Sequence, residues 1–193
     1  MGIVIAVVVA SAALFIVYKV ETGHLSASKH RSSDSYNPTA WKFADLVRPD
    51  VLYPVVRDID GDTIVANVTG HEITVRLIGI DTPETVDPRK SVQCYGPEAS
   101  AEAKRIFASG VSVYLDRDPL KGDYDKYGRL LAYIRLPSDI ASGTSMYNEY
   151  MLMQGFAREY TFSNEPYKYQ AQFRADEAAA KKARRGLWGN CPT

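Results

Sequence analysis

The segment from Arg57 to Glu84 restricts the possible folds of this chain more than any other stretch. On both sides of Gly70, β-branched and apolar residues alternate with polar ones, which is the pattern of neighbouring β-strands. Glycine readily adopts the positive φ that a short hairpin connection needs. We therefore predict a β-hairpin with its turn at Gly70, an outgoing strand from Ile64 and a return strand from Glu72 to Ile80.

An acidic cluster stands at each end of this hairpin: DGDT begins at Asp60, and DTPE ends at Glu84. Folding the hairpin brings Asp62 close to Asp81, because both lie at its open end. Carboxylate oxygens are ligands that hard divalent cations prefer, so these two aspartates form a candidate cation site. Arg76, on the return strand, is placed to face a bound anion.

Each motif alone has a simpler interpretation. Asp-Gly is a common turn dipeptide, Asp-Thr-Pro can mark the exit of a strand, and a single arginine in a strand usually faces solvent. Four acidic residues, one arginine and two turn motifs surround one predicted hairpin here. This combination favours a functional site over coincidence.

Five segments follow one another in the order and spacing of a known family: VRDIDGDTIV, VRLIGIDTPET, YGPEAS, DKYGRLLAYI and NEYMLMQGFA. On these motifs the chain resembles the staphylococcal nuclease (thermonuclease) family, from about Val55 to Trp188. The resemblance does not extend to the first fifty residues.

The pattern of elements predicts an α+β domain over residues 51–193. Five strands and three helices, with one helix between the third and fourth strands, fit a small Greek-key β-barrel of the OB type. The resemblance implies the same OB-fold. Within this domain we expect a loop from Pro137 to Thr144 and a long C-terminal helix from Pro166 to Arg185.

Phosphodiester hydrolysis needs a neutralised phosphate, a placed water molecule and a protonated leaving group. A cation can withdraw charge from the phosphate, and fixed donors can hold the developing negative oxygens. Arg76 would bind the phosphate through its planar fork of donors. Glu84 would orient or deprotonate the attacking water. Arg129 is the candidate for a second arginine, with a surface residue at the start of a strand as the alternative.

The resemblance assigns these roles residue by residue. It implies three Ca²⁺ ligands, Asp62, Asp81 and the carbonyl of Thr82. It implies three catalytic residues, Arg76, Glu84 and Arg129, and leaves open whether the glutamate is a base or only positions water. The implied activity is Ca²⁺-dependent cleavage of DNA and RNA that releases 3′-phosphorylated products.

Substrate contacts are also implied. Lys126 and Tyr127 match family positions that contact the terminal phosphate of a nucleotide. The aromatic segment that flanks the nucleotide departs from the family pattern here. Tyr160 and Phe162 have the chemistry to stack on a base, and packing in the core is the alternative role for both.

The charge balance is neutral, because lysine plus arginine and aspartate plus glutamate both number 23. A nucleic-acid-binding domain usually has a basic surface, although a catalytic cleft needs only a local positive field. The alternative function is a non-catalytic OB-fold module that binds single-stranded nucleic acid and is tethered to the membrane. The acidic and arginine positions of the family motifs are all present, which argues against this alternative.

The two cysteines, Cys94 and Cys191, lack a metal-binding spacing such as Cys-x-x-Cys. In an extracytoplasmic protein they can form a disulfide between the C-terminal tail and the loop before the first helix. Two unrelated thiols are the alternative.

The N-terminus is almost purely apolar from Ile3 to Tyr18, and with Val20 it approaches the ~20 residues that a bilayer core requires. We predict an N-terminal transmembrane helix, a membrane anchor, over residues 1–20. A cleaved secretory signal is the alternative, but it lacks a positively charged start. Residues 21–50 are polar, which is typical of a flexible linker.

The sequence gives conflicting indications of the side of the membrane on which the catalytic domain lies. Lys19, Lys29 and Arg31 follow the apolar run, and the positive-inside rule would keep this flank in the cytoplasm. The resemblance to exported proteins and the possible disulfide favour the outside. We expect a monomer that is membrane-anchored or secreted, with an extracytoplasmic catalytic domain.

Overall fold

The computed structural model describes residues 43–85, 89, 91–108, 110–140 and 143–192. The predicted membrane anchor and most of the predicted linker lie outside these ranges. Within them, no helix is long and apolar enough to cross a membrane.

The segment before residue 51 packs on the barrel. The 3-10 helix η2 runs over Phe43–Leu46, and Val47 is buried in the core. The hydroxyl of buried Tyr53 donates to the carbonyl of Leu46 at 3.1 Å and accepts from the N–H of Arg48 at 2.8 Å. This tyrosine holds the preceding segment on the barrel.

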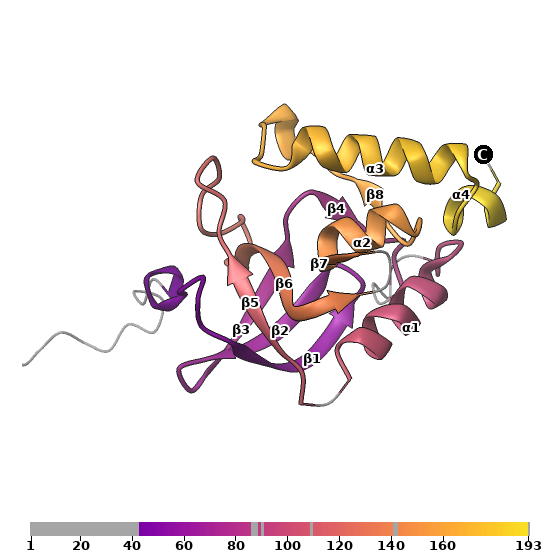
Figure 1. The fold of residues 1–193 in the computed structure, drawn as a ribbon. Coiled ribbons are helices and arrows are strands. Elements are labelled where there is room, and N and C mark those ends of the chain that lie inside the picture. The colour runs from indigo at the N-terminus through magenta and orange to yellow at the C-terminus, as the bar shows by residue number, and fades with distance from the viewer. Residues whose placement is uncertain (1–42, 86–88, 90, 109, 141–142, 193) are drawn as a thin grey trace, which may run out of the picture. The chain divides into compact units, whose positions relative to one another are not determined.

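Five strands close into a barrel, which confirms the predicted OB-type architecture. Their order is β3-β2-β1-β5-β6, and a parallel pairing between β3 and β6 completes the closure (Figure 1). Closure leaves fewer exposed strand edges than an open sheet would have. The strands are β1 (Tyr53–Asp60), β2 (Thr63–Val68), β3 (His71–Leu77), β5 (Ser112–Asp116) and β6 (Leu130–Ile140).

Three short strands and four α-helices complete the described part of the chain. Helix α1 lies between the third and fourth barrel strands, as predicted, and α3 packs against α2 (Figure 1). The short strands are β4 (Ile80–Asp81), its partner β8 (Arg158–Glu159), and β7 (Thr144–Met146), which extends the barrel sheet beside β6. The helices are α1 (Gly96–Ile106), α2 (Tyr147–Met153), α3 (Gln170–Lys182) and α4 (Leu187–Asn190), with the 3-10 helix η3 at Phe162–Asn164.

The predicted return strand from Glu72 to Ile80 is interrupted. Strand β3 ends at Leu77, and the chain turns at Gly79, whose φ is +79°. A Cβ on this glycine would lie 2.7 Å from a ring carbon of Phe173. The turn therefore needs glycine both for its backbone conformation and for its contact with α3.

Two other predicted boundaries are wrong. The expected loop from Pro137 to Thr144 begins with strand residues, because β6 continues to Ile140 and pairs with β7 through an irregular register. Proline lacks an N–H donor and is tolerated in strands at such irregularities. The C-terminal helix begins at Gln170, and a turn through Gly186 separates it from the unpredicted α4.

Helix α2 contacts both ends of the hairpin through two buried polar side chains. The hydroxyl of Tyr147 donates to the carbonyl of Gly61 at 2.9 Å. The amide of Asn148 donates to the carbonyl of Ile78 and accepts from the N–H of Ile134. Buried polar groups need such partners, so these bonds fix α2 against both ends of the hairpin.

Candidate active site

Asp62 joins the two acidic clusters at the open end of the hairpin. Asp62 is only 5% exposed, and its Oδ1 accepts a hydrogen bond from the hydroxyl of Thr63 at 2.9 Å. Oδ2 accepts from the backbone N–H of Thr82 at 2.9 Å and from its hydroxyl at 3.2 Å. The clusters therefore meet in space, in the arrangement that the hairpin predicts.

Arg76 lies between the two predicted metal-binding aspartates. Its Nη1 is 3.2 Å from Oδ1 of Asp62, and its Nη2 is 3.0 Å from Oδ1 of Asp81. Nη1 also donates to the carbonyls of Leu77 and Ile80. These contacts fix the guanidinium, and only 12% of the side chain is exposed.

The turn between β1 and β2 packs tightly against the second acidic cluster. A Cβ on Gly61 would lie 2.6 Å from Cγ2 of Thr82. No larger residue fits at Gly61 unless Thr82 moves. The glycine of the DGDT motif thus allows Asp62 and Thr82 to approach within hydrogen-bonding distance.

Asp60 shares the excess negative charge of this region. Its Oδ1 accepts a hydrogen bond from the N–H of Asp62 at 3.2 Å. Burial and the neighbouring negative charge of Asp62 raise the pKa of the Asp60 carboxyl to about 7. The carboxylates here carry more negative charge than the single guanidinium of Arg76 neutralises. A bound cation would reduce this repulsion between carboxylates.

The donor set fits a hard cation such as Ca²⁺. Asp62 and Asp81 present carboxylate oxygens, and both already bind the same cationic group of Arg76. Among the described residues there is no cluster of three or more His, Cys, Asp or Glu side chains that could hold a metal. Calcium takes about six to eight oxygen ligands, so a carbonyl such as that of Thr82 and water molecules would have to supply the remainder.

Glu84 stands two residues beyond Thr82 and is partly buried. Its backbone N–H donates to Oε1 of Gln93 at 2.9 Å, and its carbonyl accepts from the N–H of Gln93 at 2.9 Å. These two bonds attach the backbone of Glu84 to the residues before α1. The spacing of the motifs did not single out Gln93.

A cavity of about 450 Å³ opens beside Arg76. The cavity is lined by residues from the hairpin, from the loop after β5 and from the segment after β8. Predicted site residues from three parts of the chain therefore meet there. Asp62, Thr82 and Glu84 do not line the cavity. Asp62 contacts Arg76, which does line it. Seven predicted site residues line the cavity: Arg76, Asp81, Lys126, Tyr127, Arg129, Tyr160 and Phe162.

The loop before β6 contributes a group of cationic side chains. Nε of Arg129 donates to Oδ2 of Asp125 at 2.6 Å, which fixes the arginine at the rim. Tyr127 is 72% exposed. The charged groups of Lys126 and Arg129 lie 4.9 and 5.4 Å from the centre of its ring. These two side chains place positive charge at the rim, although the chain as a whole is neutral.

Tyr160 and Phe162 are 44% and 52% exposed, respectively. Neither side chain packs in the core, which was the alternative role for both. The N–H of Tyr160 donates to the carbonyl of Gly79 at 3.1 Å, and this bond holds the aromatic segment beside the end of the hairpin. Both residues line the cavity and are partly exposed.

Lys121 and Glu165 also line this cavity and were not predicted. The ammonium of Lys121 is 2.9 Å from the carbonyl and 3.1 Å from Oε2 of Glu165, although the residues lie 44 positions apart. The lysine side chain is only 9% exposed. No local pattern indicates this pair, because it depends on how the loop after β5 meets η3.

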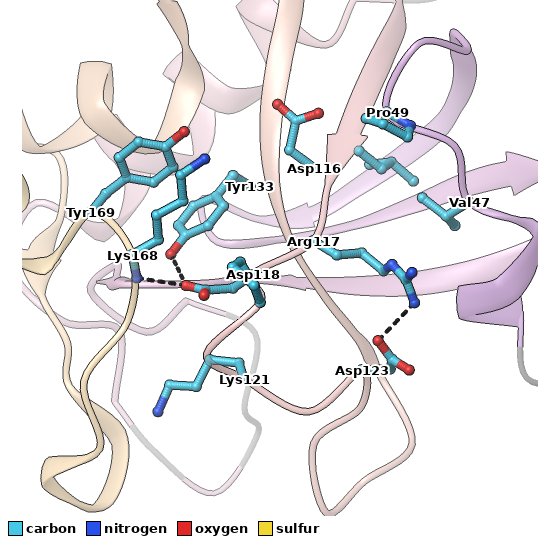
Figure 2. A pocket seen from close by; sticks show the side chains of 12 residues that line it. Val47, Pro49, Asp116, Arg117, Asp118, Lys121, Asp123, Tyr133, Lys168 and Tyr169 are labelled. Atoms are coloured by element: carbon cyan, nitrogen blue, oxygen red, sulfur yellow. Dashed lines mark hydrogen bonds and ion pairs between the residues drawn. The ribbon is translucent and has the colours of Figure 1, made fainter.

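A second cavity of about 640 Å³ lies over β5 and β6 (Figure 2). Its buried carboxylate, Asp118, accepts hydrogen bonds from the hydroxyl of Tyr133 and from the N–H groups of Leu120 and Lys168. Its other charged groups include the ion pair of Arg117 with Asp123. These charged groups already have partners within the protein, and the predicted site residues do not line this cavity. We therefore assign the chemistry to the first cavity.

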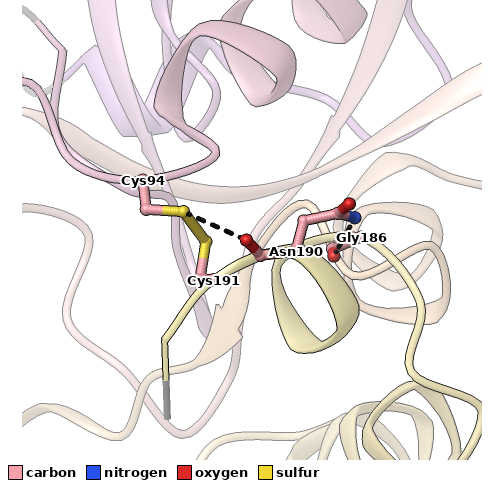
Figure 3. Close-up of a disulfide and its surroundings, with 4 residues drawn as sticks. All are labelled: Cys94, Gly186, Asn190 and Cys191. Carbon is pink, nitrogen blue, oxygen red and sulfur yellow. Dashed lines mark hydrogen bonds between the residues drawn. A yellow bond between two sulfur atoms is a disulfide. The ribbon is translucent and has the colours of Figure 1, made fainter.

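Cys94 and Cys191 form a disulfide in the structure (Figure 3). The bond joins the residues before α1 to the tail after α4, which is the connection considered from the sequence. Sγ of Cys94 also lies 3.9 Å from the carbonyl of Asn190.

Comparisons with known proteins agree with these observations. The family described as staphylococcal nuclease homologue matches residues 74–190. A thermonuclease of Staphylococcus hyicus is 41% identical over 138 residues, which cover 72% of this chain and 76% of the relative. Endonuclease YncB of Bacillus subtilis (strain 168) is 43% identical over 171 residues, 86% of this chain and 77% of the relative. A thermonuclease of Staphylococcus intermedius is 39% identical over 137 residues, 70% of this chain and 75% of the relative.

Proposed function

The chain belongs to the staphylococcal nuclease family, and from this premise we propose that it is a Ca²⁺-dependent nuclease that hydrolyses DNA and RNA. Relatives named thermonuclease and endonuclease support the nuclease activity. The finer proposal adds the dependence on Ca²⁺, both nucleic acids as substrates and 3′-phosphorylated products. The observation that carries it is the meeting of Arg76, Asp81 and Arg129 at one cavity.

Two arginines bind the scissile phosphate in this proposal. Arg76 is held by Asp62, Asp81 and backbone carbonyls, and Arg129 is held by Asp125. Their fixed donors can bind non-bridging oxygens and stabilise the charge that develops in the transition state. Because both guanidinium groups are positioned before substrate arrives, little reorganisation accompanies the reaction.

Glu84 acts on the attacking water. It accepts a proton from the water or orients it, while the water oxygen forms a bond to phosphorus. The bond from phosphorus to the 5′ oxygen breaks, and that oxygen takes up a proton. The phosphate then remains on the 3′ oxygen of the preceding nucleotide.

Asp62, Asp81 and the carbonyl of Thr82 are the proposed Ca²⁺ ligands. When bound, the cation supplies Lewis-acid neutralisation of the phosphate. The adjoining carboxylates of Asp60 and Asp62, with the raised pKa of Asp60, support a cation in this position.

In this proposal, residues at the rim of the cavity bind the nucleotide. Lys126 and Tyr127 would contact a terminal phosphate, and Tyr160 and Phe162 would stack on a base. Base stacking tolerates all four bases and does not read the 2′-hydroxyl that distinguishes RNA from DNA.

We also propose that residues 1–20 anchor a monomeric enzyme to the membrane, with the catalytic domain outside the cytoplasm. The disulfide between Cys94 and Cys191 supports an oxidising location, since such bonds are rare in the cytoplasm. Accessibility of the domain to added protease in intact cells tests this location, and protection from protease would contradict it.

The central experiment measures cleavage of heat-denatured DNA and of RNA by the purified full-length chain, with Ca²⁺ or with a chelator. We expect cleavage only with Ca²⁺ and ends that carry 3′-phosphate. We expect Glu84→Gln to lower kcat by roughly 10²- to 10⁴-fold, with nucleotide binding largely retained. Glu98→Gln, at an exposed position early in α1, is the matched control. Binding of nucleic acid without cleavage in Ca²⁺ would contradict the proposed nuclease activity and favour the non-catalytic binding module.

A further inference from the structure

The turn from Gln93 to Gly96 attaches the segment that contains Glu84 to the rest of the domain. The N–H of Gly96 donates to the carbonyl of Gln93 at 3.0 Å and closes the turn. Each residue of the turn makes a separate contact, and Gln93 makes its contact with Glu84.

The contact between Gln93 and Glu84 is reciprocal. The side-chain oxygen of Gln93 accepts from the N–H of Glu84, and the N–H of Gln93 donates to the carbonyl of Glu84, both at 2.9 Å. Two bonds to one residue restrict both the position and the rotation of its backbone. The direction in which the Glu84 side chain leaves the backbone is restricted as a result.

Gly96 supports the same segment from the other end of the turn. A Cβ at this buried position would lie 2.5 Å from Cγ2 of Thr85, 3.1 Å from the carbonyl oxygen of Pro83 and 3.3 Å from that of Glu84. The backbone on both sides of Glu84 therefore rests directly on the start of α1.

Cys94 and Tyr95 attach the turn to distant parts of the chain. Tyr95 has a left-handed backbone conformation, with φ of 67°, and its ring stacks on Phe156 at 5.7 Å. Cys94 is bonded to Cys191 in the tail after α4 (Figure 3).

The tail is itself well anchored. Leu187 is buried, and its N–H donates to the carbonyl of Gly155 at 2.9 Å. The N–H of Cys191 donates to the carbonyl of Leu187 at 3.0 Å. The disulfide therefore connects the turn to a fixed point at the end of α2.

We propose that Gln93 is a positioning residue for Glu84, and that the Cys94–Cys191 disulfide holds Gln93 in place, so that hydrolysis depends on the oxidised disulfide. This inference rests on the role proposed for Glu84. It assigns the tail a part in catalysis although Cys191 lies more than 100 positions from Glu84.

Reduction provides a chemical route between the two states. A dithiol such as dithiothreitol gives two hydrogens to Cys94 and Cys191 and becomes a cyclic disulfide itself. The S–S bond between the cysteines breaks and two thiols form. The turn then keeps its contacts to Glu84 but loses its covalent connection to the tail, so that Glu84 samples more orientations.

The experiment compares kcat, KM and binding of a nucleoside bisphosphate in Ca²⁺ for the full chain and its variants. Because a 1 Å misplacement of a reacting group can cost up to about 100-fold, we expect Gln93→Ala to lower kcat by roughly 10-fold or more. We expect KM and nucleotide binding to change by less than about 3-fold, since only the chemical step is affected. Gln93→Glu keeps an acceptor for the N–H of Glu84 and should restore most of the lost kcat. Gln172→Ala, an exposed glutamine bonded to Asp176 on α3, is the matched control.

The disulfide is tested by a mutant cycle. The double variant Cys94→Ser, Cys191→Ser should show a similar loss of kcat, and adding Gln93→Ala to it should lower kcat little further, because both changes act through one contact. Dithiothreitol should inhibit the wild-type chain and leave the double variant unchanged. If the double variant fails to fold, Gln93→Ala still tests the inference, because it retains the disulfide.

The outcomes separate this inference from the proposed function. Wild-type kcat in Gln93→Ala, or fully additive losses in the cycle, would overturn the inference and leave the nuclease intact. A wild-type chain that does not cleave, or a Glu84→Gln variant that cleaves normally, would overturn the proposed role of Glu84 first.

Discussion

Nη1 of Arg76 lies 3.2 Å from Oδ1 of Asp62, and both side chains are largely buried, at 12% and 8% exposed. Removing one partner of a buried pair leaves an uncompensated charge, which typically costs about 3–5 kcal/mol. We therefore expect Arg76→Ala to lose both stability and cleavage. Urea unfolding in a chelator measures the stability without any contribution from a bound metal.

Arg57→Ala is the matched control, because Arg57 also pairs with an acid of the same hairpin. Its contact with Glu72 is 3.0 Å long, but both side chains are more than half exposed. Exposed pairs contribute at most about 1 kcal/mol, so this variant should unfold nearly like wild type and cleave normally. Equal destabilisation by the two changes would show that Arg76 has no special part in holding Asp62.

Removal of Ca²⁺ should abolish cleavage without unfolding the protein. Arg76 contacts both Asp62 and Asp81, so a positively charged group of the protein itself holds these two carboxylates together. Adding Ca²⁺ should raise Tm in proportion to the logarithm of its concentration above Kd, by ordinary binding linkage. Circular dichroism and thermal unfolding with and without chelator measure this. Loss of secondary structure in the chelator would contradict the prediction.

The two aromatic residues of the cavity should contribute to substrate affinity. Stacking is worth about 1–3 kcal/mol per base, so Tyr160→Ala or Phe162→Ala should weaken nucleotide binding by roughly 5- to 150-fold. The changes should raise KM more than they lower kcat. Leu120→Ala is the control, since Leu120 is 62% exposed and is not among the residues that line this cavity. Unchanged KM in both aromatic variants would remove them from the binding site.

The meeting of the two acidic clusters, with Asp62 near Asp81, could be predicted from the sequence because it follows from local rules. A glycine turn and alternating strands define the hairpin, and the hairpin places its two ends together. The same reasoning could not find Lys121 with Glu165, or Gln93 with Glu84. Those contacts depend on how separate loops pack on the barrel, which no periodicity along the chain encodes.

The extension of β6 through Pro137 was missed for a different reason. Proline argues against a strand because it lacks an N–H donor. Here the strand continues because β7 pairs with it on both sides of the irregularity, at Arg135 with Met146 and at Ile140 with Thr144. Tertiary pairing therefore outweighs the local preference at this position.

Glu102 should make the free energy of unfolding depend on pH in the acid range. Its carboxylate accepts hydrogen bonds from Arg105 on α1 and from the hydroxyl of Tyr150 on α2, the latter at 2.6 Å. The bond from Arg105 is the largest cause that lowers the pKa of Glu102 below its ordinary 4.5, and it outweighs the opposite effect of burial.

The sign of the pH dependence follows from this lowered pKa. As pH falls below 4.5, the unfolded chain takes up a proton at Glu102 before the folded chain does, so the free energy of unfolding decreases. Glu102→Gln cannot ionise and should show a shallower decrease in urea unfolding between about pH 6 and pH 3. Glu98→Gln, on the exposed face of the same helix, should keep the wild-type slope. If Glu102→Gln also keeps that slope, the bridge between α1 and α2 does not need an ionised carboxylate.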